Sequence, residues 1–543
     1  MAFVNSWFLS IIKFITSSKY YRWLVPKITN LVKTYPGLIL LGTFIVVSLF
    51  AYKDYGLAWD EQQSRLCGQK TYNYVFHNDD ALKSFKDKVY GVGFEFPLVL
   101  IEKALNIQDV RNVYLMRHLV THLFFLFSAF CLYLLINYIY KNKLLAAIGF
   151  LLLALNPVLY GHSFFNSKDI PFMSMFIICL LLAAVAFKKD KLKYFLLLGI
   201  GCGLLTNIRI MGIMLISIIS FFIVMDMLLP GKNKKERIYK VKALLIFLVS
   251  ASVSLFITWP YLWIRPFGNL IDAFKEMANF RWDGDTLYLG TLVNATKLPW
   301  HYSLVYFSVS NPLVYLVFGL FGMILLMINF IRRPFRFMAE KINWNHLIYF
   351  ICFIGPITAV IVFKSTLYDG WRHLFFIYPG FILLAVYGLH FLLKTKLRSI
   401  MLMITFICFG YIAFLMIDNH PFQHIYFNQI ISNGKPDKAR KLFETDYWGT
   451  SFKSSFEYIL AHDTASIIKV NAPISPGYMN VEILKAEERK RIVCLLRDDT
   501  IGAKYFVMNY RWHPKDLVEF KPYEYHSIKV FNNTINTIFK LKK

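Results

Sequence analysis

The chain has 543 residues, of which 57% are hydrophobic and 18% aromatic, and its mean hydropathy is +0.47. A soluble globular protein of this length would not carry so much apolar surface, so the composition excludes that class. The formal net charge of +27 is compatible with nucleic-acid binding, but the 60 Lys and Arg residues cluster in short segments between apolar runs. The sequence therefore predicts a basic polytopic membrane protein.

Apolar runs long enough to cross a bilayer recur along the chain. A membrane helix needs about 17–25 apolar residues to span ~30 Å of hydrocarbon, and runs of this length are separated by polar segments. We predict a mainly α fold, a membrane bundle of about eleven helices. The predicted spans are 36–53, 113–137, 143–161, 170–187, 192–208, 210–229, 243–260, 309–331, 345–363, 374–393 and 399–417.

Positive charge alternates between successive loops. Every second loop is rich in Lys and Arg, whereas the intervening short loops carry Lys168 in one and Lys364 with Arg372 in another. By the positive-inside rule the rich loops are cytoplasmic, and eleven spans then place the C-terminal segment outside. The rich loops hold Lys188, Lys189, Lys191 and Lys193; Lys232, Lys234, Lys235, Arg237, Lys240 and Lys242; Arg332, Arg333 and Arg336; and Lys394, Lys396 and Arg398.

Three parts follow from this topology. They are a cytoplasmic or interfacial N-terminal segment (1–35), a transmembrane catalytic bundle (36–417) and an extracytoplasmic domain (418–543). In the first part, the stretch from Trp7 to Ile15 favours a short interfacial helix over a secretory signal. The bundle carries two long outer loops, 54–112, where amphipathic helices along the membrane are expected, and 261–308, which is rich in Trp, Tyr and Pro.

The C-terminal segment lacks any run of membrane length and is predicted to be a small α/β domain. A helix is expected from Ser451 to Ala461, strands at 466–471 and 505–509, and a hairpin formed by 526–531 and 535–541. Cys67 and Cys494 are the cysteines predicted to lie outside, and two unpaired thiols are favoured over a disulfide.

An acidic pair, Asp60 and Glu61, follows the first predicted span. Charge that faces lipid is costly, so ionisable groups near a span usually line a water-filled cavity or a site. A carboxylate held within hydrogen-bond reach of a hydroxyl group can act as its general base. A solvated helix end is the plain alternative.

A second polar concentration is the short outer loop that contains His162, Lys168 and Asp169. It adds a carboxylate and a cation to the face that carries the acidic pair. A turn in which Pro171 begins the next helix explains the same residues without a function.

Three cationic side chains are predicted near the outer ends of other spans. Arg209 follows an apolar span, where it is either a phosphate ligand or a snorkelling cation. Arg372 and His373 end the outer loop that begins at Tyr368.

The outer end of the second predicted span carries Arg117, His118 and His122. The two histidines are one helical turn apart, so a metal pair is one interpretation. Histidines with partners inside the bundle are the favoured one.

These residues place carboxylates and cations on one predicted face of one bundle. The sequence contains no G-x-x-x-x-G-K-[ST] phosphate loop, no metal-ligand spacing and no Ser-His-Asp order. Transfer of a group from a lipid-linked phosphate suits the set, because cations stabilise a departing phosphate and an apolar bundle accommodates a long lipid. No cofactor is indicated, a divalent metal is left open, and nucleic acid is not an expected partner.

With these motifs in this order, the chain resembles the GT-C superfamily of membrane glycosyltransferases, in the bacterial branch related to protein O-mannosyltransferases and aminoarabinose transferases. The resemblance runs over nearly the whole chain. Asp60-Glu61 is similar to the acidic motif of the family, whose Asp acts as the catalytic base. The loop 162–171 is similar to an Asn-Pro-Lys-Asp-x-Pro pattern, with Ser167 in place of the first Pro.

Further segments carry the same resemblance. Thr206 to Arg209 is similar to a Thr-x-x-Arg segment, and 371–379 is similar to an Arg-Tyr-x-x-Pro loop that meets the lipid phosphate, with His373 in place of Tyr. The segments 420–428 and 446–449 also resemble this branch. The loop 54–112 lacks the His-Pro-Pro segment of protein O-mannosyltransferases and has Tyr90 to Pro97 near that place, which argues against a protein acceptor.

The resemblance implies an inverting transfer of a hexose or pentose from a polyprenyl-phosphate donor to a lipid, glycan or protein acceptor. It implies the outer face of a bacterial cytoplasmic (inner) membrane as the location. The expected catalytic residues are Asp60, Glu61 and Asp169; the donor-phosphate ligands are Lys168, Arg209, Arg372 and His373; and the acceptor or pocket residues are Glu95, Arg117 and His162.

Two other classes of function are weighed against this one. A transporter or flippase of lipid-linked saccharides also needs a polar cavity in an apolar bundle, but the sequence shows no inverted repeat and its charges gather on one side. A scaffold subunit with a partner-binding tail needs no carboxylate at position 60. Loss of function on Asp60→Asn would therefore favour the transferase.

Overall fold

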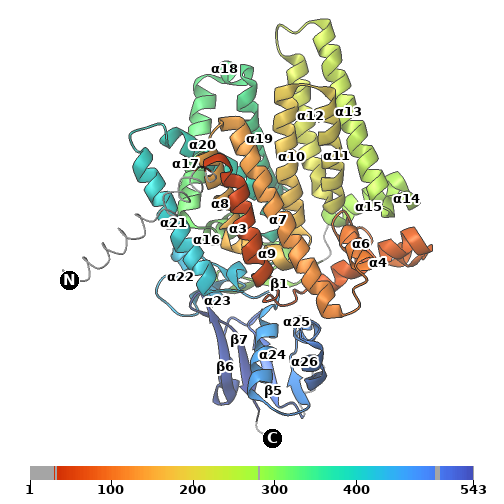
Figure 1. The fold of residues 1–543 in the computed structure, drawn as a ribbon, viewed down its shortest axis with the longest axis vertical. Helices are drawn as coiled ribbons and strands as arrows, with labels where there is room; N and C mark the ends of the chain where they lie inside the picture. Colours follow the sequence, from red (N-terminus) through yellow and green to blue (C-terminus); the bar gives the residue numbers. More distant parts are fainter. Residues whose placement is uncertain (1–29, 31–32, 279–281, 496–501, 542–543) are drawn as a thin grey trace, which may run out of the picture.

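The computed structural model describes residues 30, 33–278, 282–495 and 502–541 (Figure 1). A bundle of long helices makes up most of the molecule, and the C-terminal domain packs against one of its ends (Figure 1). The predicted interfacial helix at 7–15 falls outside the described residues.

Twelve helices of the described residues form the body of the bundle. Eight helices are long and apolar enough to cross a membrane, the bent pair α8 and α9 makes a ninth, and α3 and α11 are shorter apolar helices. Together they account for the eleven predicted spans. The twelve are α3 (Pro36–Ala51), α7 (Val110–Tyr140), α8 (Lys143–Ala154), α9 (Pro157–Phe165), α10 (Asp169–Lys189), α11 (Leu192–Ile208), α12 (Ile213–Leu228), α13 (Lys234–Thr258), α17 (Leu313–Arg332), α19 (Lys341–Val362), α20 (Tyr378–Leu392) and α21 (Arg398–Asp418).

Two spans differ from their prediction in shape. The span predicted at 143–161 bends by 63° between α8 and α9. Pro157 lacks a backbone N–H, and the Asn156 side chain starts the new helix by accepting the N–H of Leu159 (3.1 Å). Helix α13 begins at Lys234, nine residues before the predicted span, because its first turns are charged and do not count as apolar.

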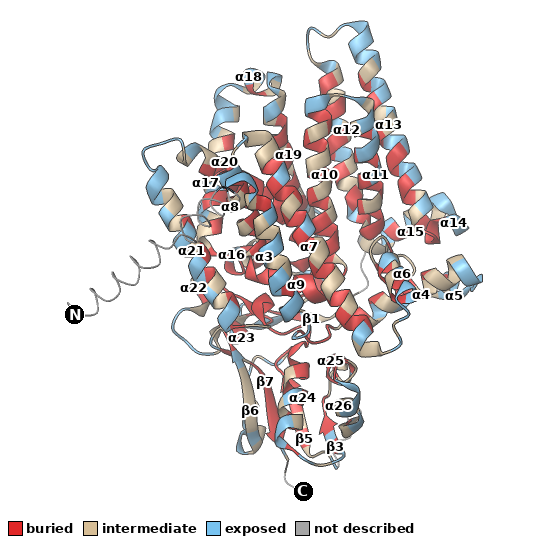
Figure 2. Cartoon of the chain, in the orientation of Figure 1, coloured by how far each residue is buried: buried red, intermediate tan, exposed pale blue. Residues whose placement is uncertain are grey.

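Burial separates central helices from lipid-facing ones. The share of the most apolar stretch that is buried inside the protein differs between helices. It is 83% for the helix that ends at Leu392 and 78% for α10, but 22% for α21. Figure 2 shows the same contrast, with exposed residues along α13 and α21. Buried apolar residues of α7, α8, α10 and α20 form the main core.

Short elements connect the spans. On the side of the C-terminal domain, α4 (Glu61–His77), α5 (Ala81–Ser84) and α6 (Glu95–Ala104) follow α3, and α14 (Tyr261–Ile264), α15 (Pro266–Ala278), β1 (Asp285–Tyr288), β2 (Thr291–Asn294), η2 (Ala295–Lys297) and α16 (Tyr302–Val309) follow α13. The remaining connectors are η1 (Ile210–Gly212), α18 (Pro334–Ala339) and η3 (Arg372–Ile377). The loop between α12 and α13, which is rich in Lys and Arg, lies at the end of the bundle opposite the C-terminal domain, as does helix α18, which contains Arg336 and follows Arg332 and Arg333 (Figure 1).

The C-terminal domain is the predicted α/β unit. Its five-stranded sheet has the order β4-β3-β5-β7-β6, with β3 parallel to β4 and β5, and β7 antiparallel to β5 and β6. The sequence did not predict the edge strand β4, which has four residues. The elements are η4 (Gln423–Ile425), α22 (Gln429–Ser432), α23 (Lys438–Leu442), α24 (Ser451–His462), β3 (Ile468–Asn471), α25 (Ser475–Met479), α26 (Ala486–Arg491), β4 (Ile492–Leu495), β5 (Tyr505–Asn509), η5 (Val518–Tyr523), β6 (Glu524–Val530) and β7 (Asn533–Lys540).

Candidate active site

Asp60 ends the segment that links α3 to α4. Its side chain makes no capping bond to α4, and the carboxylate is 36% exposed. The C-terminal domain holds this segment through two bonds: the Trp448 carbonyl accepts the N–H of Trp59 (3.1 Å), and the Asn480 side chain accepts the N–H of Leu57 (2.8 Å). The position of Asp60 is therefore set by both parts of the molecule.

Arg372 lies among three carboxylates. Its guanidinium nitrogens are 3.5 Å from Asp60, 3.6 Å from Asp169 and 3.3 Å from Asp369. The side chain is 4% exposed, and its guanidinium carbon lies 4.7 Å from the ring centre of Trp448. Ring and carboxylates together fix the plane of the guanidinium group.

Asp169 begins α10 and is fixed from two sides. The side chain of Asn166 accepts its N–H (2.9 Å) and donates to its Oδ2 (2.9 Å), and Arg209 forms an ion pair with its Oδ1. The ammonium group of the neighbouring Lys168 lies 4.8 Å from the ring centre of Tyr90.

The backbone around Gly91 positions Arg209. A Cβ at Gly91 would lie 1.6 Å from the carbonyl oxygen of Asn207, so only glycine allows this approach. The Asn207 side chain accepts the N–H of Val92 (3.1 Å) and donates to the carbonyl of Thr258 (2.8 Å). The segment that begins at Tyr90 thus packs on the end of α11, two residues before Arg209.

The sequence interpretation did not include Arg511, which the C-terminal domain supplies. Its Nη2 lies 2.9 Å from Asp369, and Nη1 donates to the carbonyl of Tyr447. Its guanidinium carbon lies 4.8 Å from the ring centre of Trp59 and 4.5 Å from that of Trp512. The sequence does offer one signal for it: the arginine is flanked by aromatic residues just after the predicted strand 505–509.

We call these seven ionisable residues the charged cluster: Asp60, Lys168, Asp169, Arg209, Asp369, Arg372 and Arg511. Burial raises the pKa of Asp60, but the four cations outweigh it and hold the pKa below its ordinary value. For Asp369 burial prevails, and its pKa is raised in spite of Arg511 and Arg372. With four cations and three carboxylates, the ionised cluster favours an added anion.

Glu61 and Glu95 point into the protein. Glu61 is 3% exposed, accepts the N–H of Ala58 (2.9 Å) and lies 3.0 Å from His118 Nε2. Glu95 forms a buried ion pair with Arg117 and accepts a hydrogen bond from Ser167. These contacts join α4 and α6 to α7.

The remaining histidines also have protein contacts. His162 is buried beside the Tyr447 hydroxyl (3.1 Å) and accepts a hydrogen bond from the Trp448 indole N–H (3.3 Å). His122 Nδ1 bonds to Ser163 (2.6 Å), and His118 Nε2 bonds to Glu61 (3.0 Å), so each histidine has a partner inside the bundle. Within the described ranges, no group of three or more His, Cys, Asp or Glu residues could hold a metal ion. Cys67 and Cys494 are free thiols.

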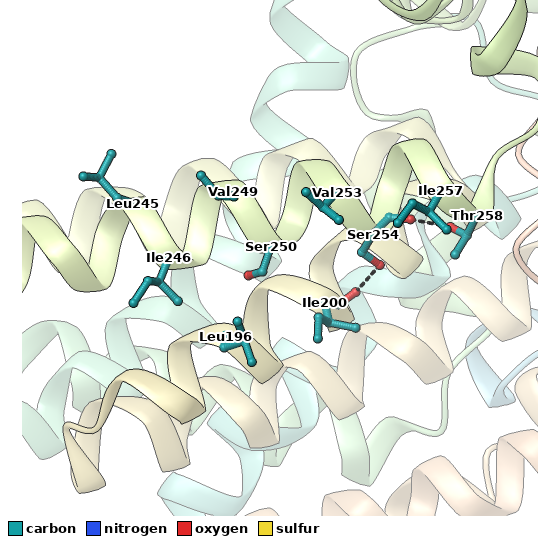
Figure 3. A pocket seen from close by; sticks show the side chains of 10 residues that line it. All are labelled: Leu196, Ile200, Leu245, Ile246, Val249, Ser250, Val253, Ser254, Ile257 and Thr258. Carbon is teal, nitrogen blue, oxygen red and sulfur yellow. Dashed lines mark hydrogen bonds between the residues drawn. The ribbon is translucent and has the colours of Figure 1, made fainter.

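An apolar groove lies between α11 and α13 (Figure 3). The two helices pack closely because Gly199 and Gly203 have no side chain; a Cβ at either position would clash with α13. The groove has a volume of about 560 Å³, and Leu196 and Ile200 face α13 across it. It ends at Thr258, whose carbonyl accepts the hydrogen bond from Asn207.

Fold and site define a multi-pass membrane protein with a cation-rich charged cluster at one end of an apolar bundle. Residues 110–257 match the family described as dolichyl-phosphate-mannose-protein mannosyltransferase. The matched segment is less than half of the chain and covers α7 to α12 with nearly all of α13. It confirms the resemblance to the GT-C superfamily of lipid-phosphate-dependent glycosyltransferases. No curated protein matches the chain.

Two solved structures illustrate the likeness in three dimensions. The oligosaccharyltransferase AglB from Archaeoglobus fulgidus, in complex with an inhibitory peptide and a dolichol-phosphate, is 10% identical over 88% of this chain and 70% of its own, with a TM-score of 0.49. ArnT from Cupriavidus metallidurans bound to undecaprenyl phosphate is 10% identical over 93% of this chain and 98% of its own, with a TM-score of 0.48. At identities this low the likeness concerns the fold alone.

Proposed function

We propose that the protein transfers a sugar from a polyprenyl-phosphate donor to an acceptor hydroxyl, with inversion at the anomeric carbon. The observation that carries the proposal is the partly exposed carboxylate of Asp60 beside an excess of cations. Lys168, Arg209 and Arg372 bind the donor phosphate. Arg372 Nε and His373 Nδ1 are buried and have no hydrogen-bond partner among the described residues, which leaves both for phosphate oxygens.

The reaction follows from these positions. The acceptor oxygen attacks the anomeric carbon from the face opposite the phosphate, and the bond between that carbon and the phosphate oxygen breaks with its electron pair. The phosphodiester becomes a monoester, so negative charge grows where Arg372 and Arg209 lie. Asp60, held ionised by the cations, takes the acceptor proton as the hydroxyl becomes acidic during attack.

The groove between α11 and α13 supplies the place for the lipid chain. It is lined by apolar side chains, and the helix α11 that forms one of its walls ends directly before Arg209 (Figure 3). A polyprenyl chain in the groove would bring its phosphate to the cationic end of the bundle. The donor sugar and the class of acceptor stay open between hexose and pentose, and between lipid, glycan and protein.

The most direct test is transfer in vitro from a panel of short-chain polyprenyl-phosphate sugars, with Asp60→Asn as the control. Asn keeps the shape of the side chain and removes its basicity. We expect turnover by the parent and none by the variant, with donor binding largely retained. Full activity of Asp60→Asn would refute the assignment of the base, and absence of transfer with retained movement of lipid-linked saccharide across vesicles would favour a flippase.

We further propose a bacterial inner membrane location with the C-terminal domain outside. The separation of the cation-rich loops from this domain supports it. In spheroplasts, a cysteine replacing Glu487 should react with an impermeant maleimide, and one replacing Lys234 should not. Both positions are exposed, so a difference in labelling would report the side of the membrane and not burial. The reverse pattern would invert the topology. Cys494 is a poor probe, because burial raises the pKa of its thiol to about 12.

A further inference from the structure

Arg511 stands apart from the other members of the charged cluster in where it comes from and what it touches. It follows β5 of the C-terminal domain, whereas the other six residues belong to the bundle and its loops. Its side chain is 6% exposed and packs on Trp59 and Trp512, which leaves little of it for a substrate. It contacts Asp369, which pairs with Arg372, and Arg372 in turn contacts the proposed base Asp60.

Those contacts form a continuous chain of charges. Arg511 pairs with Asp369 Oδ1 (2.9 Å), and Asp369 Oδ2 pairs with Arg372 (3.3 Å). Arg372 then reaches Asp60 Oδ2 (3.5 Å). Each carboxylate oxygen of Asp369 therefore faces one arginine, and Asp369 holds Arg372 by one nitrogen only.

We propose that Arg511 is a positioning residue for glycosyl transfer, which keeps Asp369 ionised so that Asp369 can hold Arg372 in place for the leaving phosphate. The inference rests on the proposed function. It makes the C-terminal domain part of the active site, because without this side chain the charged cluster lacks one of its four cations.

The electrostatics of Asp369 support this role. Burial raises the pKa of Asp369, and the two arginines oppose that effect while Asp60 adds to it. Glu444 and Tyr447 of the C-terminal domain, Tyr302 of α16 and the adjacent Tyr368 are further titratable groups that interact with it. Without Arg511, Asp369 would stay protonated to higher pH, and a neutral Asp369 would release Arg372 toward Asp60 and Asp169.

Loss of Arg511 should also change the pH dependence of turnover, in a direction that the charges determine. Without this cation the protonation of Asp369 moves upward in pH, so the acidic limb of the pH–kcat profile should move to higher pH. Activity should then recover in part as the pH rises. A residue needed for folding alone would lower activity without moving the limb.

The experiment compares Arg511→Gln and Arg511→Lys with the parent in the full-length detergent-solubilised protein, using a short-chain polyprenyl-phosphate sugar. Arg511→Gln should lower kcat at neutral pH by about ten- to a hundredfold, by analogy with the loss of groups that orient metal ligands, and shift the acidic limb to higher pH. Arg511→Lys keeps the charge but loses the fork, so it should keep the limb near that of the parent with partial activity.

The matched control is Arg440→Gln. Arg440 is a buried arginine of the same domain, paired with Asp437 (3.3 Å) and Asp516 and packed on Tyr510, but it has no contact with the charged cluster. It should lower thermal stability without moving the pH limb.

A double-mutant cycle keeps the test decisive if Arg511→Gln is unstable. Asp369→Asn should lower kcat and remove the shift, and Arg511→Gln with Asp369→Asn should be little worse than either alone, because both act through one contact. Additive losses, or a fall in kcat that is equal at every pH, would overturn the inference. If the parent protein transfers no sugar from any donor of the panel, it is the proposed glycosyl transfer that fails. A parent that transfers sugar, with variants that behave otherwise than described, would overturn the role of Arg511 alone.

Discussion

Arg372→Ala is the substitution with the largest predicted effect on the chemical step. The side chain contacts three carboxylates and has a free Nε, so it is held in the orientation that the leaving phosphate requires. Glycosyl transfer adds negative charge to the phosphate, and a preorganised donor at such a position contributes about 10²–10³ in rate, or about 3–4 kcal/mol. We expect kcat to fall by at least this factor.

The same change has a second effect that must be separated from the first. Asp169 and Asp369 are buried and would each lose a cation, and breaking a buried ion pair costs about 3–5 kcal/mol of stability. Part of this cost is avoided because Arg209 and Arg511 still pair with the same two carboxylates. The variant should therefore fold with a lower Tm.

The assay measures kcat and KM with a short-chain polyprenyl-phosphate sugar, alongside Tm in the same detergent. Arg372→Lys should restore stability more than turnover, since an ammonium group keeps the charge without the planar fork. A folded Arg372→Ala protein with turnover near that of the parent would remove this residue from the phosphate site. Equal recovery of turnover and stability by Arg372→Lys would show that only charge is needed.

Three more predictions concern the surroundings of the site. Glu61→Gln should lower stability by about 1–2 kcal/mol and leave substantial turnover, because the carboxylate serves buried partners; turnover as low as in Asp60→Asn would assign it to the reaction. Val253→Trp should fill the groove and raise KM for a long-chain donor while sparing a short-chain one, whereas Val317→Trp on exposed α17 should change neither; equal effects on both donors would rule out the groove. Burial raises the pKa of Glu444 to about 7. The free energy of unfolding should therefore fall by up to about 3 kcal/mol as the pH rises from about 4.5 to 7, because the unfolded chain loses this proton first. Glu444→Gln should therefore raise Tm more at pH 8 than at pH 5, and a Tm gain that does not depend on pH would contradict this.

The sequence was sufficient to predict the spans, because apolar length is a local property. Eleven apolar helices or helix pairs occupy the predicted ranges. The bend at Pro157 was not predicted, although an Asn-Pro pair inside an apolar run is a start signal for a new helix. The strand β4 was missed as well, because four residues directly after the charged helix α26 give no period to detect.

The site was predictable only in part. Asp60, Asp169, Arg209 and Arg372 do meet in the structure; the last three stand next to a span end, whereas Asp60 lies nine residues after α3. The neighbours Asp60 and Glu61 look equivalent in sequence, but the start of α4 turns one toward the cluster and the other inward. Arg511 does not stand at a span end, and its approach to Asp369 depends on how the C-terminal domain docks on the bundle, which is a long-range property of the fold.

The hydrogen bonds between the C-terminal domain and the segment before Asp60 also have a consequence for biosynthesis. The chain is made from its N-terminus, so Asp60 is synthesised well before Trp448, Asn480 and Arg511. The bundle can insert helix by helix, yet the hydrogen bonds that fix Leu57 and Trp59 can form only after the C-terminal domain has been made and has folded. A nascent chain therefore holds Asp60, the proposed base, without its partners and should be inactive toward lipid-linked sugars while it is still being inserted.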